Sequence, residues 1–393
     1  MELLLKGGQV WTSDHFERKN VLISGKKIMD VGVETGSAQC QTIECEETYI
    51  LPGVFDCHAH STMICGEHHM ADFFASSQTD LTIDSVINCE KMVRCGITTI
   101  RDCGGKGLET LSVRNYINQG KIPGPRMLCS GTPLKVIGGH EPGMDFTGPY
   151  EARAAVRSLI RDGVDFIKVM VTGGLGKAGE NPDSVELEYD ELEAIVDEAK
   201  RHGKKVACHC HSKLGMEMLI RAGADSIEHS TYLDQEIDKK IIDSGVYVVP
   251  TFEPYAKFAT MGEAHHVHPD TVAAAQAIIE VKKQRLYEAY KMGVKIAFGR
   301  DSGGFMMDQG DFVEEMLYME DAGMSREDII RSSSEISAGL CGLSQITGSI
   351  ETGKEADLIL LNSNPLKDLR AYRQNLKGVF SRGRYFGTED VYE

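Results

Sequence analysis

The chain of 393 residues lacks the features that would place it in a membrane or on nucleic acid. No apolar run reaches about eighteen residues, so the sequence predicts no segment that spans a bilayer. The first residues, Met1–Lys6, lack the charged start and long apolar core of a signal peptide. Basic residues are few: 42 lysines and arginines stand against 59 acidic residues. The net charge of −17 argues against nucleic acid or an anionic membrane surface as a partner and indicates a solvated acidic surface.

A disulfide framework is also missing, although the chain contains 11 cysteines. Their number is odd, and no two of them form a Cys-x-x-Cys pair. Long chains of this kind keep their cysteines reduced more often than they build a disulfide scaffold. We therefore expect free thiols and a cytoplasmic protein.

The pattern of the chain changes twice. Residues 1–50 and 345–393 consist of short β-like pieces separated by turns, whereas residues 51–344 repeat an apolar strand, a loop and an amphipathic helix. No internal repeat or low-complexity segment interrupts this order. We predict one large barrel over residues 51–344 and a small β-sandwich composite domain built from both chain ends.

The repeated unit occurs often enough to close a barrel. The candidate strands are Val54–His58, Thr98–Asp102, Arg126–Ser130, Phe166–Val171, Lys205–Cys210, Ser226–His229, Tyr247–Thr251 and Lys295–Asp301. Helical stretches such as Tyr189–His202, Lys213–Ala222 and Val272–Met292 lie between them. Alternation of eight strands with helices predicts an α/β fold of the (β/α)₈ TIM-barrel type, with its active site at the carboxyl ends of the strands.

Histidines mark several of these strand ends. His58 and His60 are two residues apart, a spacing that points both side chains to one face of a strand. Two neutral imidazoles at one place suit a divalent transition metal, most often zinc. His229 ends the sixth strand, and Asp301 ends the eighth at a transition from strand to loop. A carboxylate there can bind a metal and accept a proton from water.

Lys168 stands inside the apolar fourth strand, between Ile167 and Val169. Burial of a charged ammonium at this place would be costly, although a lysine at a strand end can also extend its charge to solvent. A neutral lysine amine can add carbon dioxide to form a carbamate, an anionic ligand able to bridge two metals. The histidines and the aspartate at the other strand ends favour this second interpretation.

The fifth strand contains alternating histidines and cysteines. His209 and His211 share one face, and Cys208 and Cys210 share the other, where their thiols should pack against helices. Only one of the two histidines need bind a metal. We prefer His209, because His211 is better placed to reach into the substrate cavity.

These residues and their order resemble the amidohydrolase superfamily across essentially the whole chain. The resemblance rests on the segment Leu51–His60, Lys168, the fifth-strand histidine, Ile227-Glu-His229, Asp301 and the segment Gly348–Leu358. It implies two divalent metal ions, with zinc expected, bridged by carboxylated Lys168 and a hydroxide. It also implies that His58, His60 and Asp301 hold one ion and that His209 and His229 hold the other.

Finer motifs are similar to the branch that contains metal-dependent prolidases and Xaa-Arg dipeptidases. These are Gly96–Asp102, Lys168–Gly174 and Ser226–Tyr232. In that branch a histidine and a tyrosine bind the terminal carboxylate of the substrate, which implies this role for His140 and Tyr232. The chain departs from the family at Arg300, where a small residue or threonine is more common, and we expect this side chain to point away from the metals.

We therefore predict an enzyme that hydrolyses an amide bond in a small substrate with a free carboxylate, such as a dipeptide or an N-acyl amino acid. Asp301 and Lys168 are its expected catalytic residues. A cyclic-amide hydrolase or a mononuclear deaminase similar to imidazolonepropionase is the alternative enzyme. A non-catalytic relative that serves in assembly is the alternative outside enzymes. We expect a homo-oligomer. Five histidines receive no role from the sequence: His68, His69, His265, His266 and His268.

Overall fold

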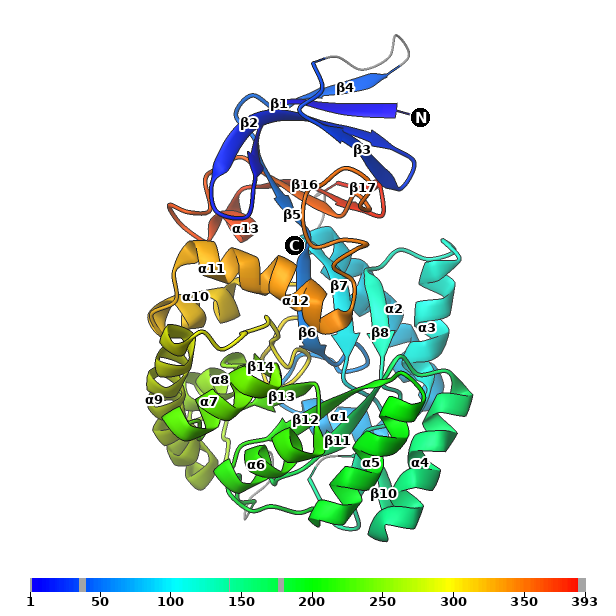
Figure 1. Cartoon of the computed structure of the whole chain (residues 1–393), viewed down its shortest axis with the longest axis vertical. Coiled ribbons are helices and arrows are strands. Elements are labelled where there is room, and N and C mark those ends of the chain that lie inside the picture. The colour runs from blue at the N-terminus through cyan, green and yellow to red at the C-terminus, as the bar shows by residue number, and fades with distance from the viewer. Residues whose placement is uncertain (1, 35–39, 141, 176–179, 388–393) are drawn as a thin grey trace.

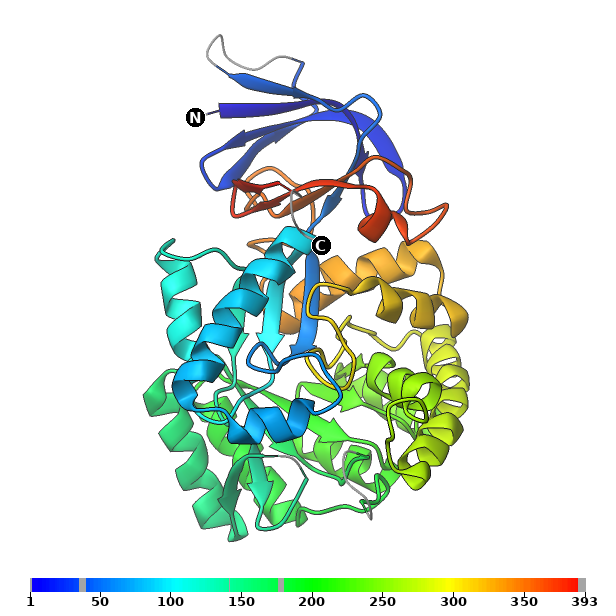
Figure 2. The same cartoon turned by 180° about the vertical axis from the view of Figure 1, so that it is seen from behind.

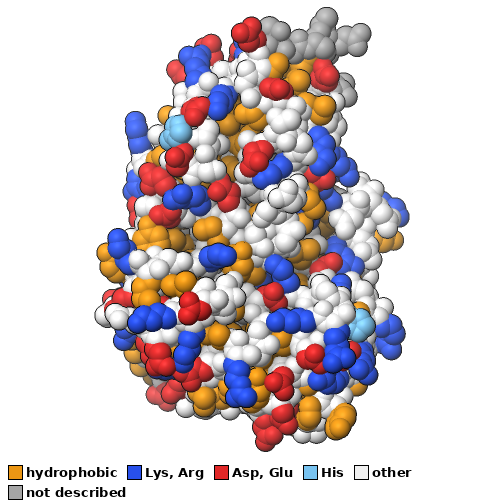
Figure 3. All heavy atoms as spheres, in the orientation of Figure 1, with side chains coloured by type: hydrophobic (Ala, Val, Ile, Leu, Met, Phe, Trp, Pro, Cys, Tyr) orange, Lys and Arg blue, Asp and Glu red, His pale blue; other side chains and the backbone are white. Residues whose placement is uncertain are grey.

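The protein is described here by a computed structural model that covers residues 2–34, 40–140, 142–175 and 180–387. Both views of the molecule place a β-rich module at one end and a barrel surrounded by helices at the other (Figures 1 and 2). No helix in these residues is both long and apolar enough to cross a membrane. On the face in Figure 3, acidic and basic side chains are interspersed.

The terminal module combines strands from both ends of the chain. Its strands are β1 (Glu2–Trp11), β2 (Phe16–Ser24), β3 (Lys27–Val31), β4 (Gln41–Glu44), β5 (Tyr49–Pro52), β15 (Leu358–Leu361), β16 (Leu376–Ser381) and β17 (Arg384–Phe386). Their order is β17-β16-β15-β5-β1-β2-β3, with β4 on β1. The antiparallel pairing of β5 with β15 joins the two ends. Apolar side chains of both ends, including Leu5, Ile23, Leu358 and Phe380, share one core, so neither end is expected to fold alone.

The barrel strands are parallel and almost entirely buried. They are β6 (Val54–Ala59), β7 (Ile97–Asp102), β8 (Arg126–Cys129), β11 (Phe166–Met170), β12 (Lys205–Cys210), β13 (Ser226–His229) and β14 (Tyr247–Val249). Two short additional strands, β9 (Leu134–Val136) and β10 (Met144–Phe146), follow β8. In Figure 1, β6 and β7 run away from the terminal module, so their carboxyl ends lie on the far side of the barrel from it.

The helices cover the outside of the barrel, except α13 (Ala371–Gln374), which packs against β16 in the terminal module (Figure 1). They are α1 (His69–Ala75), α2 (Gln78–Cys95), α3 (Glu109–Asn118), α4 (Gly148–Asp162), α5 (Tyr189–Arg201), α6 (Lys213–Ala222), α7 (Gln235–Ser244), α8 (Glu253–Met261), α9 (Pro269–Met292), α10 (Val313–Asp321), α11 (Arg326–Arg331), α12 (Ser337–Cys341) and α13 (Ala371–Gln374), with a π-helical turn η1 (Ser332–Ile336) between α11 and α12. The α/β barrel with a composite module is therefore confirmed, and the predicted helices at α5, α6 and α9 are present.

Local signals explain why the chain returns so quickly from helix to strand. Ser212 follows β12 and caps α6, because its hydroxyl accepts a hydrogen bond from the backbone of Gly215. Gly223 ends α6 with φ of 84°, a conformation that side chains with a Cβ rarely adopt. The next strand, β13, begins three residues later and carries His229 to the same end of the barrel as His209.

The prediction of a regular eighth strand over Lys295–Asp301 was wrong. This segment still closes the barrel: Ala297 N donates to Val248 O at 2.8 Å, and Cys57 N donates to Phe298 O at 2.8 Å. Two of its other backbone groups bond to serine side chains instead of a strand. Ser332 Oγ donates to Ile296 O at 2.8 Å, and Phe298 N donates to Ser337 Oγ at 3.0 Å. Because these serines come from η1 and α12, the local apolar pattern could not reveal that their side chains replace a neighbouring strand as hydrogen-bond partners.

Arg300 holds the end of this segment. Its guanidinium is fully buried and donates to Asp56 Oδ2 at 2.9 Å and to the backbone carbonyls of Asp308, Gln309 and Asp311 at 2.8–3.0 Å. The side chain therefore points away from the strand-end histidines, as expected. These hydrogen bonds connect the loop after Asp301 to Asp56 in β6.

Glu253, at the start of α8, is a buried carboxyl near this arginine. Its Oε2 lies 3.9 Å from Arg300 Nη1 and has no hydrogen-bond partner among the described residues. Burial raises the pKa of Glu253 to about 8. Between about pH 4.3 and about pH 8, the carboxyl of Glu253 is therefore protonated in the folded protein but ionised in the unfolded chain. The free energy of unfolding should fall as the pH rises from about 4.5 to about 8.

We expect Glu253→Gln to remove this loss of stability. The variant should gain a few kcal/mol over the wild type at pH 9 but change little at pH 5, because the amide does not ionise. Urea unfolding at the two pH values measures this difference, with Glu263→Gln on an exposed side chain as control. Equal effects of Glu253→Gln at both pH values would contradict the interpretation.

Candidate metal centre and substrate cavity

The six residues predicted as metal ligands meet at one place. His58 and His60 come from the end of β6, Lys168 from β11, His209 from β12, His229 from β13 and Asp301 from the segment that closes the barrel. All six line a cavity with an empty volume of about 960 Å³, including its opening to solvent. The carboxyl ends of parallel barrel strands converge, and this convergence brings together residues separated by more than 240 positions in the sequence, from His58 to Asp301.

His58, His60 and Asp301 form the tightest group. Asp301 Oδ1 lies 3.1 Å from His60 Nε2 and 3.5 Å from His58 Nε2. His60 Nδ1 donates to the carbonyl of Gly104 at 2.8 Å. This hydrogen bond fixes the ring of His60 so that its Nε2 faces the carboxylate of Asp301.

Opposite charges on His60 and Asp301 favour this contact. Burial would lower the pKa of His60, but the hydrogen bond to Asp301 outweighs burial and raises it. Burial would raise the pKa of Asp301, but His58 and His60 outweigh burial and lower it. Asp301 is therefore a carboxylate at neutral pH, able to bind a cation or accept a proton.

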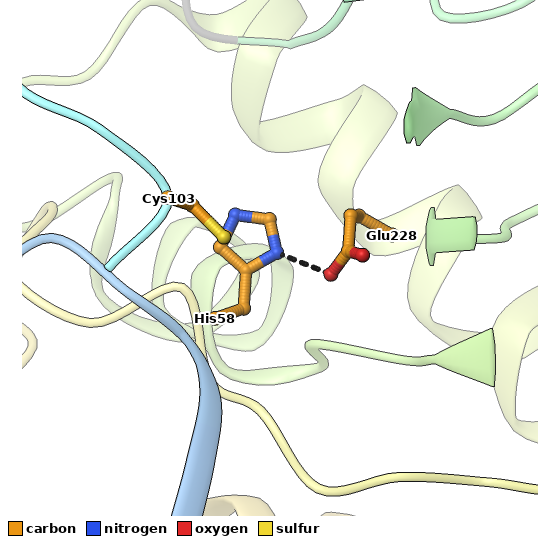
Figure 4. A group of neighbouring side chains, drawn as sticks. All are labelled: His58, Cys103 and Glu228. Carbon is orange, nitrogen blue, oxygen red and sulfur yellow. Dashed lines mark hydrogen bonds and ion pairs between the residues drawn. The ribbon is translucent and has the colours of Figure 1, made fainter. Parts of the chain in front are cut away.

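Glu228 orients His58 from behind. Figure 4 shows the hydrogen bond between them, in which His58 Nδ1 donates to Glu228 Oε2 at 2.9 Å. Arg101 from β7 donates to Glu228 Oε1 at 2.6 Å, and Ser226 Oγ donates to the same oxygen at 2.5 Å. Although burial opposes ionisation, Arg101 and His58 lower the pKa of Glu228 to about 2. A histidine held in this way keeps Nε2 as its ligand atom.

Cys103 lies beside His58 and Glu228 in Figure 4, and the three side chains could by spacing alone form a second metal site. Two facts argue against this. Both oxygens of Glu228 already accept hydrogen bonds, and burial raises the pKa of Cys103 to about 12, which keeps it a thiol. We interpret Glu228 as a residue that positions His58.

Lys168 connects this group to the other histidines. Its side chain is 1% exposed, and its Nζ lies 3.1 Å from His58 Nε2. The ring centroid of His229 lies 4.9 Å from that of His58 and 4.4 Å from that of His209. Lys168 and His229 therefore approach His58 together, and the two groups of predicted ligands form one continuous site.

His209 and His211 differ in their partners. His211 Nδ1 is 2.7 Å from Thr231 Oγ1, and its Nε2 is 3.3 Å from the hydroxyl of Tyr255, so both ring nitrogens face side-chain oxygens. His209 Nε2 donates to Gly173 O at 3.3 Å, which leaves Nδ1 as the acceptor. Burial and neighbouring positive groups hold the pKa of both histidines well below the usual range. Neutral imidazoles are the form that binds metals, and the partners favour His209.

The donor set fits a divalent metal. One ligand atom from each of His58, His60 and Asp301 lies within 4.8 Å of the others, and Lys168, His209 and His229 lie directly beside them. Imidazole nitrogens with a carboxylate oxygen are the ligands that zinc prefers in catalytic sites.

The structure brings one of the two expected carboxylate-binding residues to the cavity. His140 is buried, its ring centroid lies 4.5 Å from that of His209, and its Nδ1 lies 2.9 Å from Glu180. Tyr232 is half-buried, and the described residues that line the cavity do not include it. Tyr255, which no sequence motif had indicated, lines the cavity instead. It lies in α8, outside every motif that the sequence analysis identified.

The five unassigned histidines have different environments. His69 lines the cavity. His265 contacts Glu67 in the loop between β6 and α1. His268 caps the start of α9, where its side chain accepts a hydrogen bond from Asp270. His68 and His266 are absent from the described lining of the cavity.

Comparisons with known proteins agree with this geometry. The model of the amidohydrolase family matches residues 49–385. Ochratoxinase from Aspergillus niger is 30% identical over 393 residues, which covers 90% of this chain and 79% of the relative. A solved Xaa-Pro dipeptidase with methionine bound in its active site is 31% identical, with a TM-score of 0.90, and covers 98% of this chain and 100% of that one. A solved prolidase in complex with N-methylphosphonate-L-proline is 25% identical, with a TM-score of 0.90 and the same coverage.

Proposed function

Because the chain belongs to the amidohydrolase family and is a hydrolase of C–N bonds, we propose that it cleaves an amide bond in a small substrate with a free carboxylate. The observation that carries this proposal is the convergence of six candidate ligand residues from five positions around the barrel on one cavity. Structural ion pairs would not require so many neutral histidines at strand ends.

Two divalent metal ions, with zinc expected, would be held by these six residues. His58, His60 and Asp301 would hold one ion, His209 and His229 would hold the other, and Lys168 as a carbamate would contact both. When bound, such ions lower the pKa of water from about 15.7 toward neutrality and polarise the carbonyl that is attacked.

Asp301 would transfer the proton. Its carboxylate is ionised at neutral pH and faces the cavity, so it can accept the proton of the attacking water. The same group can then donate that proton to the nitrogen of the leaving amine. His60 Nε2, 3.1 Å away, keeps the carboxylate in place during this transfer.

His140 would recognise the carboxylate of the substrate, because its ring lies beside His209 at the wall of the cavity. The ligands named for the two solved relatives, methionine and a proline derivative, carry a carboxylate next to a nitrogen. Tyr232 is a weaker candidate for this role because it does not line the described cavity. The hydroxyl of Tyr255 and the ring of His211 are placed to complete the polar wall.

We expect removal of metal to abolish turnover. The protein treated with a chelator should lose hydrolysis of every member of a library of dipeptides and N-acyl amino acids, measured as release of free amine. Addition of zinc with bicarbonate should restore it. Metal analysis of the restored enzyme should find two equivalents per chain. One equivalent at full activity would support a mononuclear deaminase or cyclic-amide hydrolase instead.

A further inference from the structure

One half of the cavity is apolar. Its described lining there includes Met63, Met70, Phe73, Phe258, Phe305 and Met307. These side chains come from the region between β6 and the end of α1, from α8 and from the loop after Asp301. A concave wall of this composition suits a large apolar group of a ligand.

The centre of this wall is a pair of stacked rings. The centroids of Phe258 and Phe305 lie 4.9 Å apart, with an angle of 8° between the ring planes. His265 contacts Phe305 edge-on at 5.8 Å and also contacts Glu67 in the loop before α1. These contacts join the loops after two different strands, so the wall is formed before a ligand enters.

Phe258, at the centre of the apolar wall, and His140 come from opposite positions in the barrel. His140 lies between β9 and β10, after the third barrel strand, β8, whereas Phe258 follows β14, the seventh, and the rest of the wall follows the first and eighth positions. In a closed ring of eight strands, the third and the seventh are opposite each other. The predicted metal ligands lie between them. A substrate whose carboxylate is at His140 would therefore place its acyl part against the apolar wall.

Charge distinguishes the acyl parts that this wall could accept. Asp301, in the metal centre, is the single carboxylate among the described residues that line the cavity. A dipeptide would bring a free ammonium group into the apolar half, where the described side chains offer it no ion pair. Burial of an unpaired charge is costly.

We propose that the enzyme prefers amides whose acyl part is a large, uncharged aromatic group, so that N-arylacyl amino acids are better substrates than dipeptides. This proposal rests on the proposed function and on the position of His140. It names the class of substrate and identifies Phe258 and Phe305 as residues that determine specificity.

Three matched substrates test it: the 3-phenylpropanoyl, acetyl and L-phenylalanyl amides, each prepared on L-proline and on L-methionine. The first and third differ by one amino group, and the first and second differ by the benzyl group. With the zinc-loaded enzyme, kcat/KM for the 3-phenylpropanoyl amide should exceed both others by roughly 10- to 100-fold. The preference over the acetyl amide comes from burial of the phenyl group, and the preference over the L-phenylalanyl amide comes from the cost of an unpaired ammonium group.

The variant Phe258→Ala should reduce the preference for 3-phenylpropanoyl over acetyl roughly tenfold. Phe258 is partly exposed, so this change should leave the unfolding midpoint close to that of the wild type. Phe74→Ala is the matched control, because Phe74 is 49% exposed in α1 and does not line the described cavity. This control should keep the full preference.

The outcomes separate the two proposals. If none of the six amides is hydrolysed by the zinc-loaded enzyme, the proposed function fails, and this inference fails with it. If they are hydrolysed but the phenylalanyl or acetyl amide is as good as the 3-phenylpropanoyl amide, the inference is overturned and the proposed function stands. Loss of preference in Phe74→Ala equal to that in Phe258→Ala would also overturn it.

Discussion

Asparagine in place of Asp301 is expected to lower kcat/KM by roughly 10³-fold or more. The amide has nearly the same shape as the carboxylate, but it cannot accept a proton from water or return one to the leaving nitrogen. Transfer of this proton by a positioned side chain is worth roughly 10²- to 10⁴-fold in rate. The change also removes a negative charge that lies 3.1 Å from His60 Nε2 and 3.5 Å from His58 Nε2.

Two measurements make this expectation specific. The metal content of Asp301→Asn shows how much of the loss comes from weaker metal binding, and unfolding by urea shows that the fold is intact. Asp321→Asn, on an exposed side chain of α10, controls for the loss of one negative charge. If Asp301→Asn retained more than about a tenth of the wild-type kcat/KM with full metal content, another group would have to transfer the proton.

Truncation of Lys168 to alanine should have an effect of similar size. The side chain is buried, and its Nζ lies 3.1 Å from His58 Nε2, so its removal leaves a space between the two groups of ligands. A carbamate on this lysine would supply an anionic oxygen to both metals, which alanine cannot replace. We expect kcat/KM to fall at least about 10³-fold, as for other catalytic groups that contact the reacting centre.

The carbamate itself can be tested separately from the lysine. A small carboxylate such as formate, added to Lys168→Ala, should enter the space and restore part of the activity. Lys168→Arg keeps the positive charge but cannot carry a carbamate, so it should be inactive with or without formate. In the wild type, ¹³C-labelled bicarbonate should give a carbamate signal by NMR that is lost in both variants. Full activity of Lys168→Arg would exclude the carbamate as a ligand.

Much of the barrel could be predicted because its signals are local. Parallel strands buried on both faces are apolar throughout, and caps such as Ser212 and Gly223 lie at the ends of the helix that they limit. The segment Lys295–Asp301 has the same apolar pattern, yet it is not a regular strand. Two of its backbone groups bond to serine side chains of η1 and α12, which lie more than thirty residues further along the chain.

The candidate site also contains residues that the sequence could predict and residues that it could not. His58 and His60 could be recognised because a spacing of two residues on a strand specifies a common face. Arg101 and Tyr255 could not, because their importance comes from contacts with Glu228 and His211 on other strands. Tyr232 stands in a recognisable motif, but the structure leaves it outside the described cavity lining.

By itself, the sequence determined the kinds of candidate ligand and their order along the strands. The period of a strand and the chemistry of histidine, lysine and aspartate are properties of short segments. The tertiary structure alone decided which ring nitrogen of His58 faces the site, and that the rings of Phe258 and Phe305 stack in the wall of the cavity. These features depend on which separate strands and loops come together around the closed barrel. The local periodicity of the sequence does not specify those contacts.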